Sequence, residues 1–278
     1  MTGGSLASDP ERWPYAADYN DPLMAALYDA EETDTQDIAL LRRLIAAWRP
    51  AGALLHILEC FSGTGRILVP LVADGHRVTG IEMAPAMRAR AQAKVDALGA
   101  EARCRTTLRV GDVLAGEWGA GYDLVILGGN CLYELPDPDA QERCIALAAR
   151  ALAPGGRLYV DNDDYHGQWA GPQDRELRTT FEGCGPDGSY GRAERIDLAF
   201  DDHTQVLTML RRWYVRRPDG SEVRREYVSR KHPVTAAEAR AWLDAHGLQV
   251  VGLYGDWQGT PHAAGSPRAI FWAEKPRD

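Results

Sequence analysis

The stretch LLHILECFSGTGRILVPLVADGHRVTGIE, residues 54–82, decides the fold. An apolar run ends at Glu59, a glycine-rich bend follows, a helical pattern takes over, and a second apolar run ends at Glu82. Phe61 stands where many such turns have their first glycine. This order of elements is typical of a βαβ unit. The stretch therefore predicts the start of a parallel sheet, with a ligand-binding turn at its strand ends.

The alternation continues to residue 165 and resumes after residue 234. In the closing part, Thr235 is expected to cap a helix that ends at His246 before Gly247. Near-continuous apolar strands indicate burial on both faces of the sheet. We predict an α/β fold with a Rossmann-like, seven-stranded, mostly parallel sheet and helices on both faces. The expected strands are 54–60, 76–82, 105–110, 122–128, 156–162, 248–254 and 268–274, and the main helices are 64–74, 85–98 and 138–152.

Two regions depart from this alternation. Residues 23–50 have helical apolar spacing, which predicts N-terminal helices before the sheet. Extended segments joined by DDHT and RPDGS predict an antiparallel insertion, too long for a connecting loop. The expected division is an N-terminal helical cap at 1–50, a core of 51–165 and 233–278, and an inserted lid at 166–232.

Composition and charge limit the function classes. The chain has 278 residues, of which 45% are hydrophobic and 26% charged, and this is typical of a globular protein. A formal net charge of -9 argues against a partner with a phosphate backbone. No stretch has the pattern of a membrane span or signal peptide, and the five cysteines lack metal-ligand spacing. We expect a cytoplasmic protein without nucleic-acid or membrane partners.

The glycine turn does not have the sequence motif of a phosphate-binding loop. A dinucleotide fingerprint needs a third glycine where Leu68 stands. A P-loop needs Gly-Lys-Ser/Thr, but Gly65 is followed by Arg66. The turn can still direct backbone N–H groups at a carboxylate. Glu82 suits ribose hydroxyls, and Asp112 suits either an adenine amino group or a helix N-cap.

Together these positions resemble the class I S-adenosylmethionine-dependent methyltransferases. In that family the glycine loop takes the methionine part of the cofactor, the acid after strand two takes the ribose, and the acid after strand three takes the adenine. The resemblance implies S-adenosyl-L-methionine as cofactor, S-adenosyl-L-homocysteine as product, and no metal. The cofactor contacts it implies are Tyr15, Tyr19, Glu59, Phe61, Gly63, Thr64, Gly65, Arg66, Glu82, Met83, Asp112, Val113, Gly128, Asn130 and Glu134.

A narrower resemblance begins after the fourth expected strand. The segment GGNCLYELPDPDAQERCIALAARALAPGGRLYVDNDDYH is similar to the glycine N-methyltransferase branch and related small-molecule enzymes. Asn130 matches an Asn that touches cofactor and substrate there, whereas Glu134 replaces a His. The arginine that grips the carboxylate of glycine has no match, so glycine is a poor acceptor. The expected catalytic residues are Asn130, Asp161, Tyr165 and His166.

The sequence thus favours methyl transfer to a small-molecule amine. Methylation of a small-molecule hydroxyl is the alternative, with His166 or His232 as a general base. Two further hypotheses remain, a NAD-dependent oxidoreductase and a catalytically inactive binding protein on the same fold. The acceptor's identity is open, and so is a homo-oligomeric state.

Overall fold

The computed structural model describes residues 19–168 and 176–277, and the chain divides into two compact units. The larger comprises Thr33–Gln168 and Lys231–Asp278, and the smaller Met1–Glu32 and Trp169–Arg230. The two N-terminal helices, expected in one cap, fall into different units. Helix α1 (Pro22–Glu31) belongs to the smaller unit, and α2 (Gln36–Trp48) belongs to the larger.

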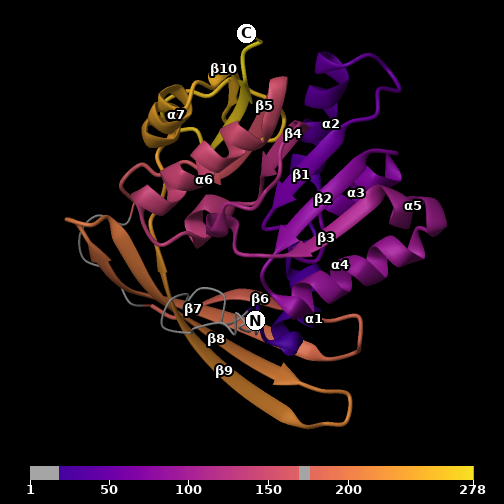
Figure 1. The fold of residues 1–278 in the computed structure, drawn as a ribbon. Coiled ribbons are helices and arrows are strands. Elements are labelled where there is room, and N and C mark those ends of the chain that lie inside the picture. Colours follow the sequence, from indigo (N-terminus) through magenta and orange to yellow (C-terminus); the bar gives the residue numbers. More distant parts are fainter. Residues whose placement is uncertain (1–18, 169–175, 278) are drawn as a thin grey trace, which may run out of the picture. The chain divides into compact units, whose positions relative to one another are not determined.

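The larger unit contains a seven-stranded sheet in the order β10-β11-β5-β4-β1-β2-β3 (Figure 1). The neighbours from β5 to β3 pair in parallel, whereas β11 is antiparallel to both β5 and β10. This confirms the mostly parallel seven-stranded sheet expected from the sequence. The strands are β1 (His56–Cys60), β2 (Arg77–Glu82), β3 (Thr106–Val110), β4 (Tyr122–Leu127), β5 (Leu152–Asp163), β10 (Gln249–Tyr254) and β11 (Arg268–Glu274).

Both faces of this sheet are buried. On one face, Ile57 and Ile126 pack in a core cluster with Leu41 of α2. The alternate residues Leu58 and Val125 are also 0% exposed, because successive side chains of a strand point to opposite faces. Apolar strands of this kind need cover on both sides. The helices of the larger unit besides α2 are α3 (Leu68–Ala73), α4 (Pro85–Ala97), α5 (Ala100–Arg105), α6 (Pro138–Ala151) and α7 (Ala236–Ala245).

Side-chain N-caps begin the helices α1, α6 and α7. Thr235 and Glu238 form a capping box at the start of α7, as the sequence indicated for Thr235. Helix α3 begins only at Leu68, four residues later than expected, because residues 63–67 form the end of the glycine turn. The expected strand over 105–110 is preceded directly by the short helix α5, which periodicity did not reveal.

The smaller unit contains an antiparallel sheet in the order β6-β7-β8-β9, with α1 packed against it. Its strands are β6 (Arg178–Cys184), β7 (Tyr190–Asp201), β8 (Val206–Arg216) and β9 (Glu222–Lys231). The sequence predicted β7 to β9 and missed β6, whose side chains are mostly exposed. Met24 and Leu27 of α1 pack with Trp213 and Val215. No helix among the described residues is long and apolar enough to cross a membrane.

Candidate cofactor and acceptor site

The glycine turn between β1 and α3 has an unusual backbone. Phe61, Gly63 and Gly65 all have positive φ angles, of 56°, 53° and 79°. Only glycine adopts this left-handed region without steric cost, and another residue loses about 1–2 kcal/mol there. The structure therefore explains why glycine is common at the position of Phe61. The contacts around the turn must hold Phe61 in this conformation.

Packing as well as ligand access requires two of the glycines. A Cβ atom on Gly65 would lie 2.9 Å from Cγ2 of Val69 and 3.2 Å from Cβ of Ala91. A Cβ atom on Gly128, which follows β4, would lie 2.7 Å from Cδ1 of Ile67. These distances are too short for ordinary packing. Gly65 thus allows the turn to approach α3 and α4 closely.

Glu82 ties the turn to the end of β2. Its carboxylate accepts hydrogen bonds from the backbone N–H of Gly63 at 2.8 Å and of Ala84 at 2.7 Å. Burial raises the pKa of Glu82, and the two backbone donors oppose that rise. A carboxylate offers about four acceptor sites, so further donors can still bind. Met83 follows Glu82 in the bend before α4.

Asp112 caps a short helix after β3. Its carboxylate accepts a hydrogen bond from the N–H of Leu114 at 2.8 Å, at the start of the 3-10 helix η1 (Val113–Ala115). The N-cap role is therefore present in the structure, and a second ligand remains compatible with the carboxylate's acceptor sites. Val113 is buried, and its carbonyl accepts from Trp118 Nε1 at 2.7 Å.

Glu59, before the turn, and Thr64, within it, are both buried. Glu59 is 4% exposed at the end of β1, and its Oε2 has no hydrogen-bond partner among the residues that the structure describes. Burial raises the pKa of Glu59 well above its usual range. Thr64 is fully buried, and its hydroxyl accepts a hydrogen bond from Lys94 Nζ at 3.1 Å. A buried, unsatisfied carboxyl oxygen is unusual outside functional sites.

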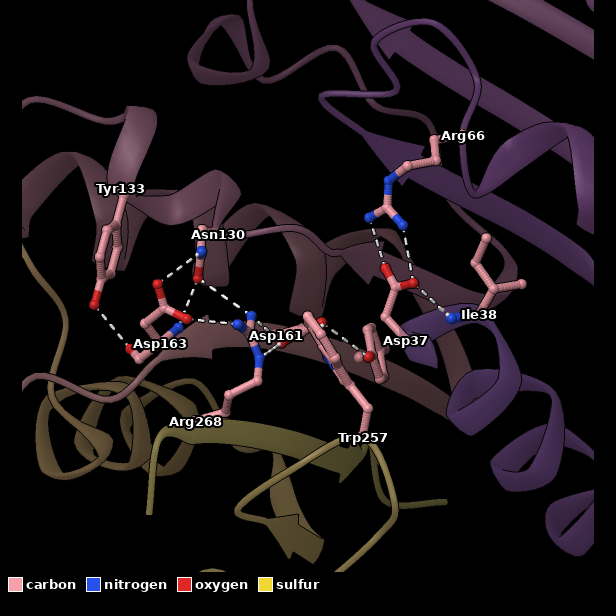
Figure 2. Close-up of polar contacts among 10 residues, drawn as sticks. Asp37, Ile38, Arg66, Asn130, Tyr133, Asp161, Asp163, Trp257 and Arg268 are labelled. Carbon is pink, nitrogen blue, oxygen red and sulfur yellow. Dashed lines mark hydrogen bonds and ion pairs between the residues drawn. The ribbon is translucent and has the colours of Figure 1, made fainter. Parts of the chain in front are cut away.

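Arg66 is bound to the start of α2. Its guanidinium donates to both carboxylate oxygens of Asp37, at 2.9 and 2.6 Å (Figure 2). It also donates to the carbonyl of Asp34 at 2.9 Å. Asp37 is 3% exposed and Arg66 is 19% exposed. The side chain expected to contact the cofactor is thus engaged in a two-pronged ion pair within the larger unit.

A second arginine organises the ends of β4 and β5. Arg268, at the start of β11, donates to Asp161 from Nε at 2.8 Å and from Nη2 at 2.6 Å, and it also binds Asp163 at 2.5 Å (Figure 2). Trp257 Nε1 donates to the other oxygen of Asp161 at 3.0 Å. The Trp257 ring lies 4.4 Å from the guanidinium carbon of Arg268. Asp161 is 0% exposed, so its carboxylate is enclosed by these contacts.

Asn130 and Asp163 face each other across the strand ends. Asn130 has a φ of 60°, and its amide donates to Asp163 Oδ2 at 3.0 Å. The backbone N–H of Asp163 donates back to Asn130 Oδ1 at 2.6 Å, and Tyr133 donates to the Asp163 carbonyl at 2.8 Å (Figure 2). The Asp163 side chain remains 48% exposed. It is a fixed carboxylate that a ligand can reach.

The segment after β5 contains two histidines near one buried carboxylate. Asp164 is 4% exposed and accepts from His262 Nε2 at 2.7 Å, with His166 Nε2 at 3.5 Å. His166 Nε2 also lies 2.8 Å from the carbonyl oxygen of Ser266, and its side chain is 42% exposed. Tyr165 between them is buried. Of the four expected catalytic residues, Asn130 and His166 thus retain the most contact with solvent.

The remaining expected residues have other surroundings. Glu134 forms an ion pair with Lys231 at 2.5 Å. His232 is 2% exposed and bonded to Gln141 Oε1 at 2.9 Å, and burial lowers its pKa, so it is a structural residue of the core. Tyr19 lies in the smaller unit, where its ring meets that of Tyr28 edge-on. Tyr15 lies outside the described residues.

Sequence reasoning missed Arg268, Trp257 and Asp37. Arg268 is a charged residue at the head of the apolar strand RAIFWAE, which was a signal that something at that strand end binds it. Asp37 stands among apolar residues of an amphipathic helix and is buried there. Their partners are distant in sequence, so no local pattern named them.

Comparisons with known proteins point to methyltransferases. Residues 57–156 match the family model described as a methyltransferase domain. The chain has the fold of the CcbJ methyltransferase from Streptomyces caelestis, with a TM-score of 0.70 and 22% identity over 93% of this chain and 98% of that one. No curated protein matches the sequence.

Two further solved structures have the same fold. CalS10, an amino pentose methyltransferase from Micromonospora echinaspora, gives a TM-score of 0.67 and 22% identity over 91% of this chain and 96% of that one. The sugar N-methyltransferase KedS8 from Streptoalloteichus sp. gives 0.68 and 20% identity over 100% of this chain and 96% of that one. Residues 57–156 thus match a methyltransferase domain, and the chain has the fold of these solved methyltransferases.

Proposed function

We propose that the protein transfers a methyl group from S-adenosylmethionine to an amine of a small molecule. One observation carries the proposal: polar side chains stand at the ends of four of the five parallel strands of a methyltransferase-type sheet. They are Glu82 at the end of β2, Asp112 after β3, Asn130 after β4 and Asp163 at the end of β5. Open parallel sheets bind ligands at this edge.

The residues around the glycine turn fit the cofactor. Glu82 keeps acceptor sites for ribose hydroxyls while it holds the turn, and Asp112 keeps one for an amino group. The unsatisfied Oε2 of Glu59 beneath the turn suits a donor or cation. When bound, the cofactor supplies an already activated methyl group. The chain's main task is then to position the acceptor, and positioning can contribute about 7–11 kcal/mol to lowering the barrier.

The acceptor side favours an amine. Asp161 and Asp163 share one arginine, Arg268, and Asp164 pairs with His262. This excess of carboxylates over arginines attracts a positively charged or hydroxyl-rich molecule. Asp163 is the exposed member and can accept hydrogen bonds from an amino group. A free alkylamine has a pKa of about 10 and is therefore protonated at neutral pH, so it must lose a proton before it attacks. Two proteins of the same fold are described as acting on an amino pentose and on a sugar nitrogen. Amino sugars are therefore the first acceptors to test.

His166 supports O-methylation as a second candidate. A carbonyl oxygen only accepts hydrogen bonds, so the His166 nitrogen that faces Ser266 at 2.8 Å must be the one that carries hydrogen. The other ring nitrogen of a neutral imidazole then has a free lone pair. A hydroxyl acceptor benefits from such a base, because it must lose its proton during transfer.

Two measurements test the proposal. Calorimetry should show binding of S-adenosylmethionine and S-adenosylhomocysteine, but not of NAD; the reverse result would establish the oxidoreductase alternative. Transfer of radiolabelled methyl to a panel of amino sugars and their hydroxyl counterparts should then favour the amines. Binding of the cofactor without turnover on either set would favour the non-catalytic binding protein.

A further inference from the structure

The ion pair between Asp37 and Arg66 joins the start of α2 to the glycine turn. Each carboxylate oxygen of Asp37 receives one N–H of the guanidinium, and Oδ1 also accepts from the backbone N–H of Ile38 at 2.8 Å. This parallel geometry is strong and directional. Figure 2 shows the pair with Arg66 descending from the turn toward the first turn of α2.

The pair joins three segments that border the candidate cofactor site. Arg66 directly follows Gly65, the last left-handed residue of the turn. Asp37 belongs to α2, which is anchored to the core by Ile38 and its apolar neighbours. A Cβ atom on Gly129 would lie 3.5 Å from Arg66 Nη2, so the guanidinium lies near the backbone before Asn130. The Arg66 side chain thus extends from the turn, pairs with the helix and lies near the end of β4.

The turn needs support from outside. Phe61 occupies a left-handed conformation that its own side chain disfavours. Glu82 holds the turn from the β2 side by accepting from Gly63 N. Arg66 holds it from the opposite end, through contacts that local sequence does not provide. A strained backbone persists only when its surroundings determine it fully.

We propose that Asp37 and Arg66 are positioning residues for the cofactor turn. The ion pair fixes the shape of the turn before the ligand arrives, so the protein does not spend binding energy on ordering it. Arg66 acts through Asp37 and need not touch the cofactor. This inference rests on the proposed function, since it requires that the turn bind S-adenosylmethionine and its product.

The variant Asp37→Asn distinguishes a positioning role of the ion pair from direct contact between Arg66 and the cofactor. That variant leaves Arg66 in place and changes only its partner, whose amide group places a donor against the donors of the guanidinium. If Arg66 contacted the cofactor itself, Asp37→Asn would bind it normally and only Arg66→Met would lose affinity. If the pair positions the turn, both variants lose affinity. The double variant then loses no more affinity than the single variant with the larger loss.

The experiment is a double-mutant cycle read by calorimetry with S-adenosylhomocysteine. We expect Asp37→Asn and Arg66→Met each to raise the Kd about tenfold or more, and the double variant to match the worse of them. Arg42→Met is the control: Arg42 makes a similar two-pronged pair from the same helix to Asp74, at 2.6 and 2.9 Å, but that pair is exposed and away from the turn. Its Kd should stay within about twofold of wild type.

The outcomes decide between the two claims. Wild-type protein that does not bind S-adenosylhomocysteine refutes the proposed function. Normal binding by wild type and by Asp37→Asn, or additive losses in the cycle, overturns the positioning role alone. Circular dichroism checks that each variant is folded. If Asp37→Asn does not fold, Arg66→Lys decides, because lysine keeps the charge but cannot reproduce the paired bonds; wild-type affinity in Arg66→Lys would then overturn the inference.

Discussion

Replacing Arg268 with methionine tests how the acceptor side is held together. Methionine keeps much of the side-chain volume and removes the charge that faces Asp161. Asp161 is 0% exposed, and Arg268 supplies two of its hydrogen bonds. Breaking a buried ion pair by removing one partner costs about 3–5 kcal/mol. We therefore expect Arg268→Met to lower the free energy of unfolding by about that amount.

The loss should depend on pH. Burial raises the pKa of Asp161, and Arg268 opposes that rise. A buried acid whose folded-state pKa exceeds its unfolded value binds more protons when folded, so its contribution to stability falls as pH rises through that interval. Without Arg268 the folded pKa rises further and the interval extends upward. The deficit of Arg268→Met relative to wild type should thus be larger at pH 8 than at pH 5.

The assay is urea unfolding of wild type and variant at both pH values. Arg157→Met is the matched control, because Arg157 pairs with Glu274 across the same two strands at their other end, at 2.5 Å. Glu274 is 27% exposed, so removing its partner should cost only about 1 kcal/mol. An Arg268→Met protein as stable as the control, or one with the same deficit at pH 5 and pH 8, would refute this account.

Three further variants test the turn and the strand ends. Gly65→Ala should destabilise the protein by about 1–3 kcal/mol more than Gly52→Ala, because both glycines have a φ of 79° but only a Cβ at Gly65 meets close neighbours; equal midpoints in thermal unfolding would contradict the packing role. Glu82→Ala should weaken binding of S-adenosylhomocysteine by at most a few kcal/mol, measured by calorimetry, and unchanged affinity in a folded variant would remove it from the cofactor site. Asn130→Gly keeps the left-handed backbone and deletes the amide, so methyl transfer should fall while the fold persists; wild-type turnover would exclude Asn130 from the acceptor site.

The order of strands and helices could be predicted because it follows from local patterns of apolar residues and helix caps. Near-continuous apolar runs marked β1, β2, β4, β5 and β11, and the Thr235 capping box marked α7. Strand β6 was missed, since an exposed edge strand needs neither alternation nor apolar residues. The glycine turn and the acids at the strand ends were visible as well, because strand ends in a parallel sheet share one edge.

The residues that hold the site depend on contacts between distant parts of the chain. Arg268 reaches Asp161 because β11 pairs antiparallel with β5, in a register that places Arg268 opposite Asp163. Arg66 meets Asp37 only once α2 has packed on the sheet. The sequence alone did not explain why many such turns have glycine at the position of Phe61. The left-handed φ of 56° supplies the reason.

The sequence by itself determined the class of sheet, the turn that starts it and the acids that border it. These features depend on the hydrophobic period and on spacings of a few residues, which are local. Only the tertiary structure decided which charges pair. Arg66 pairs with Asp37, Arg268 pairs with Asp161, and the Asp163 side chain remains half-exposed. The physical reason is that the energy of a charge depends on its burial and on the partners that folding brings within a few ångströms.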